Sequence, residues 1–218
     1  MSAAPPMPPE AETPFDARSF QAATGAGQAQ MADLERYRVL LETWNQRINL
    51  VGPSALASFW LRHAYDSAQL LQIAPEARVW ADLGTGAGLP GVVLAILLRD
   101  ARGAHVHLVE SLAKRCRFLD EVVATLALPA TVHRARAEDL RLTGIDVVTA
   151  RACAPLAKLL EYAQPVLRGG VRGLFLKGRD AEAEVAEARR MWRFEVDLIP
   201  SLSDPSGRVV SIKRLARG

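Results

Sequence analysis

The sequence predicts a doubly wound α/β fold, with a mostly parallel seven-stranded sheet and a helical N-terminal extension. Two observations predict it. From residue 78 onward, short apolar runs of strand character alternate with longer runs of helical periodicity, which is typical of a parallel sheet with right-handed crossovers. Before that, apolar residues recur every three or four positions between residues 31 and 48, which indicates an amphipathic helix.

The N-terminal part divides into a tail and a helical extension. Residues 1–14 hold five of the thirteen prolines and residues 19–30 are small and polar, so residues 1–30 are expected to be a disordered Pro/Ala-rich tail. The extension then covers residues 31–75, and the α/β domain covers residues 76–218. Its apolar stripe consists of Leu34, Tyr37, Leu40, Leu41, Trp44 and Ile48. Ser54 is expected to cap a second helix, and a third, short helix carries Leu70 and Leu71.

The elements of the α/β domain follow from the same alternation. Strands are expected near Arg78–Leu83, His105–Glu110, Thr131–Arg136, Asp146–Arg151, Val171–Lys177, Arg193–Ile199 and Arg208–Lys213. Helices are expected near Gly91–Arg99, Ala113–Leu126, Pro155–Leu167 and Ala181–Arg190. The last two strands are close in sequence, so we expect them to form an antiparallel pair at the sheet edge.

Composition excludes several classes of protein. Apolar residues make up 50% and charged residues 23%, as in globular proteins. No uncharged apolar window reaches about 18 residues, so no membrane span is expected, and the N-terminus lacks the basic and apolar regions of a secretory signal. The two cysteines, Cys116 and Cys153, form no CxxC pair, so we expect no disulfide framework and no metal site, and a reducing cytoplasm as location.

A glycine-rich loop joins the first strand to the first helix of the domain. It reads Asp82-Leu83-Gly84-Thr85-Gly86-Ala87-Gly88-Leu89-Pro90-Gly91. Glycine at every second position permits a tight turn and lets a ligand approach the main chain. In open α/β sheets ligands bind outside the carboxyl ends of the strands, at such a turn. The loop is therefore the predicted ligand site.

Two ligands compete for this loop. Gly86, Gly88 and Gly91 match the GxGxxG spacing of dinucleotide-binding proteins, and Glu110 follows 19 residues later, where an acid would bind the ribose. Starting at Asp82, the same residues spell DxGxGxG, the pattern of S-adenosylmethionine sites. A turn that only packs helix on strand is disfavoured by the four glycines and the two strand-end acids.

The charge of Asp82 favours the methyl donor. We expect its carboxylate at the strand end, facing the crevice, where it would repel a pyrophosphate and attract the ammonium and sulfonium groups of S-adenosylmethionine. At ~4 Å and an effective dielectric of about 20, one pair of unit charges contributes roughly 4 kcal/mol before desolvation. Glu110 suits either ligand, because both carry a ribose with two hydroxyls.

Further motifs follow the loop and precede it in a fixed order. They are Asn49-Leu50, His63-x-x-Asp66-Ser67, ADLGTGAGLPGVVLAI, LVESLAKRCRFLDEV, RAEDL, ARACAPLAKLLEYA and FLKG. Together they resemble the ribosomal small-subunit methyltransferase G family, over roughly residues 33–214. Many methyltransferases share the glycine loop, whereas Pro90-Gly91, the Ser-x-x-Lys-Arg run and the Arg-Ala strand end make the resemblance specific.

The resemblance implies a Rossmann-like class I methyltransferase of the bacterial cytoplasm. Such an enzyme uses S-adenosylmethionine to methylate N7 of guanine 527 in 16S ribosomal RNA, so the implied partner is that RNA or the small-subunit particle. We expect a monomer. The family's cofactor residues carry over to Gly84, Leu89, Ala137, Glu138 and Arg151. Leu89 stands where the family often has Phe, which is expected to change the packing of the adenosine slightly.

The predicted cofactor site adds Asp82, Gly86, Gly88 and Glu110 to these residues. Asp82 is expected to orient the methionine end, and Glu110 to accept hydrogen bonds from the ribose. Ala137 and Glu138 are expected to border the adenine, and acids at 138 and 139 also suit the start of a helix.

Two cations are candidate contacts on the substrate side, Arg151 and Lys177. At the end of the fourth predicted strand, Arg151 can reach the cofactor carboxylate or an RNA phosphate, or form a structural ion pair with Asp82 or Asp146. The wider RNA surface depends on whether the basic residues of three segments meet on one face. These are Lys114, Arg115, Arg117, Lys177, Arg179, Lys213, Arg214 and Arg217.

Other conspicuous residues have structural alternatives. His63 and Asp66 are expected to share one helix face. Three roles are considered for them: bracing the glycine loop, approaching the target base, or pairing with each other on the helix surface. Tyr37 and Trp44 are expected to pack in the core rather than stack on bases. Cys153 lacks the preceding proline of a cysteine nucleophile, so we expect a small residue packed beside the loop.

No catalytic acid or base is predicted. Guanine N7 offers a lone pair and carries no proton, so in-line displacement needs only proximity and orientation. Four alternatives remain open at this point: a methyltransferase for another RNA, one for a small molecule, an NAD-dependent oxidoreductase, and a non-catalytic RNA-binding module.

Overall fold

The computed structural model describes residues 15–52, 56–167 and 170–218. Helical segments precede the sheet, among them α1 (Ala17–Thr24), α2 (Gln28–Ile48), η1 (Phe59–Tyr65) and α4 (Asp66–Ile73). The stripe predicted for residues 31–48 is confirmed as the inner face of α2, where Leu34, Tyr37 and Leu41 are buried. Trp44 packs against Phe118, with ring centroids 5.8 Å apart, so Tyr37 and Trp44 belong to the core as expected.

The predicted tail is wrong for residues 17–30. The Asp16 side chain accepts a hydrogen bond from Ser19 N (2.9 Å), and Gly25 ends α1 in a left-handed conformation. Phe20 is fully buried, and its ring lies 5.5 Å from that of Trp60. The rest of the predicted tail, residues 1–14, lies outside the described residues.

Helices η1 and α4 form one continuous segment, although the sequence predicts two helices. The first seven residues have π-helical hydrogen bonding, and the α-helix begins directly at Asp66. The predicted cap, Ser54, lies outside the described residues. The π turn matters for the site because Arg62, His63 and Asp66 all lie at this junction.

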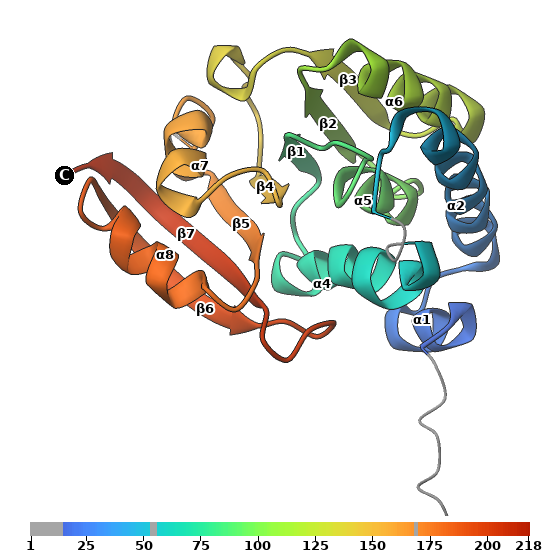
Figure 1. Cartoon of the computed structure of the whole chain (residues 1–218), viewed down its shortest axis with the longest axis horizontal. Coiled ribbons are helices and arrows are strands. Elements are labelled where there is room, and N and C mark those ends of the chain that lie inside the picture. Colours follow the sequence, from blue (N-terminus) through green and yellow to red (C-terminus); the bar gives the residue numbers. More distant parts are fainter. Residues whose placement is uncertain (1–14, 53–55, 168–169) are drawn as a thin grey trace, which may run out of the picture.

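The predicted seven-stranded sheet is confirmed, with strand order β3-β2-β1-β4-β5-β7-β6. The strands are β1 (Val79–Leu83), β2 (His105–Glu110), β3 (Ala130–Arg134), β4 (Val147–Arg151), β5 (Arg172–Lys177), β6 (Trp192–Pro200) and β7 (Arg208–Arg217). All pairs are parallel except those of β7, which runs antiparallel to both β5 and β6. The final two strands therefore form the expected antiparallel pair, and β6 is the edge strand (Figure 1).

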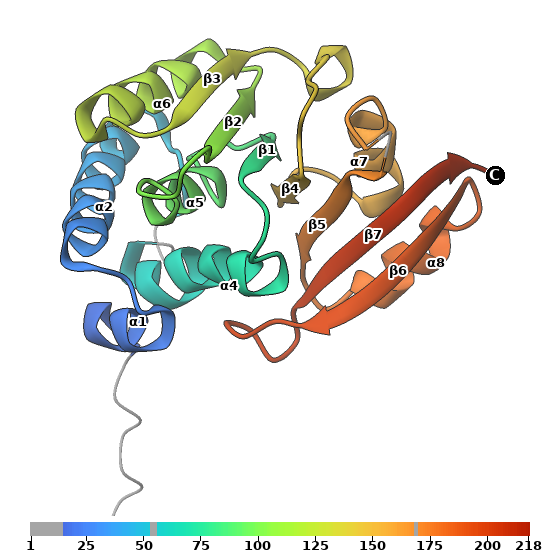
Figure 2. The ribbon, with the colours of Figure 1, turned by 180° about the vertical axis from the view of Figure 1, so that it is seen from behind.

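Helices cover both faces of the sheet, as a doubly wound fold requires. They are α5 (Gly91–Leu97), α6 (Ala113–Leu126), α7 (Leu156–Ala163) and α8 (Ala181–Ala188). Side chains alternate along β1: Trp80 joins a core with α2, α4, α5 and α6, whereas Ala81 and Leu83 join a second core with α7 and α8. The N-terminal helices thus share a core with α5 and α6 (Figures 1 and 2).

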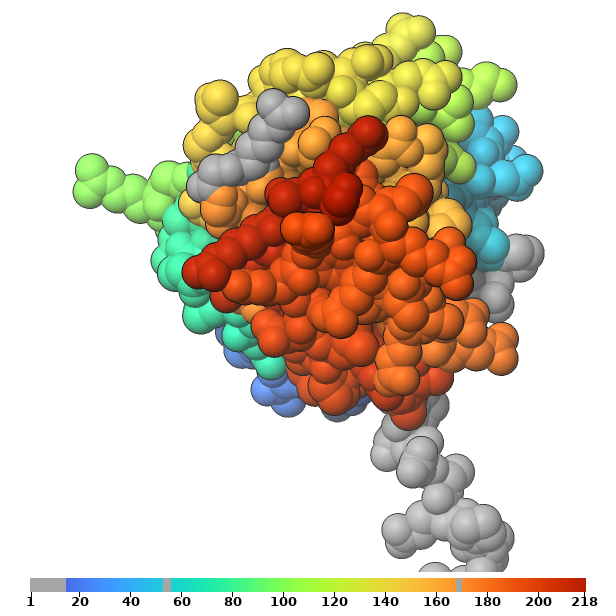
Figure 3. Space-filling model, turned by 90° about the vertical axis from the view of Figure 1, so that its left-hand side faces the viewer, coloured from blue at the N-terminus to red at the C-terminus, as the bar shows by residue number. Residues whose placement is uncertain are grey.

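The strand register separates two edges of the sheet. Strands β1, β2, β4 and β5 end at one edge, where the glycine loop lies. Because β7 is antiparallel, Arg208 pairs with Lys177 at this edge, whereas Ile212 pairs with Gly173 toward the other. Lys213, Arg214 and Arg217 follow Ile212 on β7 and therefore lie toward the amino edge. Figure 3 shows the C-terminal segment, in red, on the surface of the molecule. They do not join the basic residues of 114–117 and 177–179, so the predicted RNA surface is divided.

Among the described residues, no helix is long and apolar enough to cross a membrane.

Candidate functional site

Three glycines of the loop, Gly84, Gly86 and Gly88, have positive φ angles, and at Gly84 and Gly88 a Cβ atom would also clash with a neighbouring side chain. Gly84 and Gly88 have φ angles of +64° and +91°, a region that residues with a side chain rarely adopt. A Cβ atom on Gly84 would lie 2.6 Å from Cys153 Sγ, and one on Gly88 would lie 2.4 Å from Val92 Cγ2. The loop is therefore packed tightly on both sides, against the segment after β4 and against α5.

Tyr37 holds the loop from the N-terminal helices. Its hydroxyl donates a hydrogen bond to the carbonyl oxygen of Ala87 at 2.6 Å, and its side chain is fully buried. Burial raises the pKa of Tyr37 well above its usual range, so the hydroxyl keeps its proton and remains a donor. No local sequence pattern predicts this contact, because it joins residues 50 positions apart.

Asp82 lies beneath the loop and not in the crevice, which corrects the sequence prediction. Its side chain is fully buried, and its Oδ2 atom accepts hydrogen bonds from Thr85 Oγ1 and from Gly91 N (2.8 Å). Its Oδ1 atom is buried and has no hydrogen-bond partner among the described residues. Burial raises the pKa of Asp82 to about 7, although Thr85, Gly91 and Arg151 act against the rise.

A cavity of about 140 Å³ opens where the loop meets the ends of β2 and β3. It brings together four of the predicted cofactor residues, Gly84, Glu110, Ala137 and Glu138. The remaining lining residues are Val109, Ser111, Ala135, Arg136, Cys153 and Tyr162. Gly86, Gly88, Leu89 and Arg151 do not line this cavity, and Leu89 is buried in the core that includes α5.

Glu110 is the best-fixed acid of this cavity. Only 4% of it is exposed, its Oε2 atom accepts from Gly86 N (3.1 Å), and its Oε1 atom accepts from Leu112 N (2.8 Å). Arg115 lies 3.6 Å from Oε2. Each carboxylate oxygen has a second lone pair, so Glu110 keeps the capacity to accept from hydroxyls of a ligand.

Ala137 and Glu138 belong to the short helix η2 (Ala137–Asp139), as the acids at 138 and 139 suggested. Just before it, Ala135 N donates to the carbonyl oxygen of Glu110 at 3.1 Å, which places η2 beside the end of β2. Sequence reasoning missed Tyr162, which α7 brings to the same cavity. The only signal for it was its position in the helix that follows β4.

Cys153 lies beside the loop, as expected. It lines the same cavity as Gly84 and is partly exposed, and the partial burial of its thiol together with the nearby Asp82 raises the pKa of that thiol. A thiol with a raised pKa carries little thiolate at neutral pH and is a weak nucleophile. The environment of Cys153 therefore argues against covalent catalysis.

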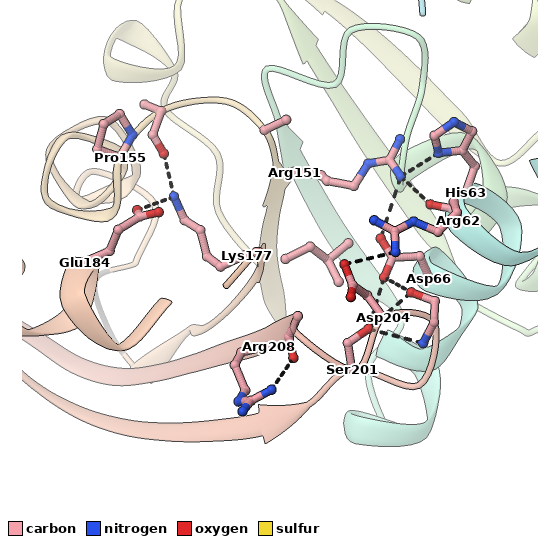
Figure 4. A pocket seen from close by; sticks show the side chains of 16 residues that line it. Arg62, His63, Asp66, Arg151, Pro155, Lys177, Glu184, Ser201, Asp204 and Arg208 are labelled. Carbon is pink, nitrogen blue, oxygen red and sulfur yellow. Dashed lines mark hydrogen bonds and ion pairs between the residues drawn. The ribbon is translucent and has the colours of Figure 1, made fainter. Parts of the chain in front are cut away.

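Arg151 lies in a second, larger cavity of about 660 Å³, where Figure 4 shows its guanidinium directed at His63. Its Nη1 atom donates to His63 Nδ1 (2.8 Å) and to the carbonyl oxygen of Arg62 (2.9 Å). The same atom lies 3.6 Å from Asp66 Oδ2. The partner carboxylate is thus Asp66, and neither Asp82 nor Asp146 forms the ion pair considered from the sequence.

His63 is a neutral acceptor in this group. Burial and the charge of Arg151 lower its pKa to about 4. An arginine cannot accept a hydrogen bond, so Nδ1 of His63 is unprotonated and Nε2 carries the hydrogen. Of the roles considered from the sequence, the structure shows His63 and Asp66 bracing Arg151 rather than the glycine loop.

Lys177 is committed to structural contacts, contrary to its expected role on the substrate side. Only 8% of its side chain is exposed, and Nζ lies 2.7 Å from Glu184 Oε2 and 2.6 Å from the carbonyl oxygen of Ala154. Glu184 Oε2 also accepts from Leu156 N at 2.6 Å, so the pair ties the start of α7 to α8 (Figure 4).

The described residues contain no group of three or more side chains that could hold a metal ion.

Comparisons with known proteins agree on one family. The family model for rRNA small subunit methyltransferase G matches residues 30–208. A protein of Caulobacter vibrioides (strain NA1000 / CB15N), named ribosomal RNA small subunit methyltransferase G, is 60% identical over 206 residues, which cover 94% of this chain and 95% of that protein.

Solved structures of methyltransferases share the fold. A putative O-methyltransferase from Klebsiella pneumoniae superposes with a TM-score of 0.57 at 13% identity, covering 90% of this chain and 95% of the other. A SAM-dependent methyltransferase from Aquifex aeolicus has a TM-score of 0.53 at 12% identity, covering 82% and 97%. At these identities the likeness concerns the fold alone.

Proposed function

The chain belongs to the rRNA small subunit methyltransferase G family, and from that premise we propose that it methylates N7 of guanine 527 in 16S ribosomal RNA. That it is an S-adenosylmethionine-dependent rRNA methyltransferase follows from the family and the fold. The position on the RNA and the mechanism are the proposal. We further propose that the enzyme acts as a monomer in the cytoplasm.

The observation that carries the cofactor assignment is Glu110, fixed by two backbone N–H groups at a cavity that also meets Gly84 and η2. Gly84 lines this cavity without a side chain, at a position where a Cβ would clash with Cys153 Sγ, and Asp82 Oδ1 is a buried acceptor without a partner among the described residues. These features fit S-adenosylmethionine better than a dinucleotide, because the carboxylate of Asp82 beneath the loop would repel the pyrophosphate of a dinucleotide.

We propose these roles for the individual residues. Glu110 accepts from the ribose hydroxyls, and Ala137 and Glu138 border the adenine. A cavity of about 140 Å³ is smaller than the roughly 300–1,000 Å³ of typical ligand pockets, so the methionine end would extend along the loop, toward Asp82 and Arg151. The charge of Arg151 lowers the pKa of Asp82 slightly, which supports a position of Arg151 on the side of the methionine end.

The mechanism needs positioning and no general base. The cofactor supplies a methyl group on a sulfonium centre. The larger cavity, which Arg151 borders, would receive the guanine with N7 directed at that group. Since N7 carries no proton, His63 is not needed as a base, and its role is to hold Arg151. The base must leave its stack to reach the cavity, because the major groove of A-form RNA is too narrow.

Transfer of labelled methyl from S-adenosylmethionine tests the proposal. We expect label in 16S rRNA or small-subunit particles, and its mapping in RNA from a deletion strain should show the loss of one 7-methylguanine at position 527. Label at another nucleotide, or only in small molecules, would overturn the substrate assignment. Binding of NAD in place of S-adenosylhomocysteine, measured by calorimetry, would overturn the cofactor assignment.

Glu110→Gln is expected to weaken the binding of S-adenosylhomocysteine by about tenfold, because hydrogen bonds to a charged acceptor contribute about 1.5–3 kcal/mol and neutral ones less. Calorimetry of the two proteins measures the change. Glu121→Gln, on the exposed side of α6, is the matched control and should bind as the unchanged protein does. Equal affinities for all three proteins would remove Glu110 from the cofactor site.

Cys153→Ala is expected to leave methyl transfer within about twofold of the unchanged protein, because a protonated thiol is not a useful nucleophile. The initial rate of labelled methyl transfer to rRNA measures this. Complete loss of transfer, with binding of S-adenosylhomocysteine retained, would contradict the mechanism and favour covalent catalysis.

A further inference from the structure

The loop between β6 and β7, residues 201–207, lies at the carboxyl ends of the parallel strands, where the candidate site also lies. Strand β6 ends at Pro200, which pairs with Arg208, and Arg208 pairs with the last residue of β5, Lys177. Both ribbon views show this loop beside α4 (Figures 1 and 2). Four of its residues line the larger cavity, namely Ser201, Ser203, Asp204 and Gly207.

The loop is held firmly onto the helical segment that carries His63. Asp66 Oδ1 accepts from Ser203 Oγ at 2.6 Å, and Gln69 Oε1 accepts from Leu202 N at 2.9 Å. Arg62 Nη1 lies 2.9 Å from Asp204 Oδ2 (Figure 4). The backbone on both sides of Leu202 is therefore fixed to α4 and η1.

The side chain of Leu202, in contrast, is 52% exposed. It is one of four large hydrophobic side chains that are exposed among the described residues. A single exposed leucine is ordinary on a protein surface. Leu202 itself does not line the larger cavity, but Ser201 and Ser203 on either side of it do. What distinguishes Leu202 is this position on an ordered backbone, so that little backbone conformational entropy remains to be lost on binding.

We propose that Leu202 inserts into the RNA strand beside the target guanine and occupies the space that the base vacates. The inference rests on the proposed function, because only a nucleotide that leaves its stack creates such a space. Proteins that unstack or bend nucleic acids insert apolar side chains between bases in this way. Arg62, half exposed although it pairs with Asp204, and Arg208 flank the loop, and we expect them to contact the neighbouring phosphates.

The test compares three variants in methyl transfer to the small-subunit particle. Leu202→Ala is expected to lower kcat/KM by about tenfold, because the extruded base loses the side chain that replaces it in the stack. Leu202→Phe, which keeps an apolar side chain, should retain most of the activity. Met191→Ala is the matched control, because Met191 is 55% exposed and directly precedes β6 at the opposite edge of the sheet.

Two binding measurements distinguish the loss of an inserted side chain from a general loss of folding or binding. Binding of S-adenosylhomocysteine should be unchanged in all three variants. The dependence of RNA affinity on salt should also be unchanged for Leu202→Ala, since no phosphate contact is lost. Equal activity of Leu202→Ala and the unchanged protein, or equal losses in the Ala and Phe variants, would overturn the insertion. No transfer to RNA by the unchanged protein would instead overturn the proposed function.

Discussion

Gly84→Val is expected to abolish cofactor binding. At Gly84 the backbone φ is +64°, and a Cβ would lie 2.6 Å from Cys153 Sγ. A valine must therefore change the backbone or displace Cys153. Gly84 and Cys153 line the same cavity as Glu110, so either change would deform that cavity. We expect the affinity for S-adenosylhomocysteine to fall by about 100-fold or more, which corresponds to roughly 3 kcal/mol. Calorimetry with the purified variant measures it.

A matched control separates the clash from the strain of a positive φ. Gly103 has a φ of +78°, and a Cβ there would meet nothing within 4 Å. Gly103→Val should therefore lose some stability and keep its affinity for the cofactor. The double variant Gly84→Ala with Cys153→Ala should bind better than Gly84→Ala alone, because the nearest clashing atom is gone. Near-normal affinity of Gly84→Val would show that the loop does not hold the cofactor.

The affinity for S-adenosylmethionine is expected to rise with pH through about 7, the pKa that burial gives to Asp82. Asp82 lies beneath the loop, so its ionised carboxylate would attract the ammonium and sulfonium groups of the cofactor across the loop and not by direct contact. Asp82→Asn keeps an oxygen that can accept from Thr85 and Gly91, and it removes the charge. We expect this variant to bind more than about tenfold more weakly at pH 8, with little dependence on pH. Titrations at several pH values measure both effects.

Stability should respond to pH in the opposite sense to cofactor affinity. The pKa of Asp82 is higher in the folded protein than in the unfolded chain, so its contribution to stability is fully present below about pH 4 and is lost as pH rises through about 7. Asp82→Asn should thus melt at a higher temperature than the unchanged protein at pH 8, and the difference should shrink at pH 5. If the variant binds the cofactor normally at pH 8, Asp82 only braces the loop.

Most of the fold follows from local patterns in the sequence. Buried parallel strands read as short apolar runs between helical segments, so every strand of the sheet is predicted close to its observed position. Helix α1 escaped because its single buried side chain, Phe20, gives no periodicity in a segment of small polar residues. The junction of η1 and α4 escaped because π-helical and α-helical turns bury similar residue types.

The site follows from the sequence only where topology alone decides it. Strand ends meet at one edge, which is why Gly84, Glu110 and Ala137 lie together as predicted. Strand-end position does not determine where the Asp82 side chain points. Because side chains alternate along β1, the side chain of Asp82 points toward α5, as that of Trp80 does. The role of Lys177 depends on Glu184, which the packing of α8 brings to it.

The hydrogen bond from Tyr37 to the glycine loop gives the N-terminal helices a place in the ligand site itself. Strands and helices from residue 76 onward include every residue proposed to touch the cofactor, yet the loop among them is held by a hydroxyl from α2. The α/β unit therefore depends on its N-terminal extension for one contact of the glycine loop. During synthesis α2 is made before the glycine loop, so the hydroxyl of Tyr37 is already present as a donor when the loop folds.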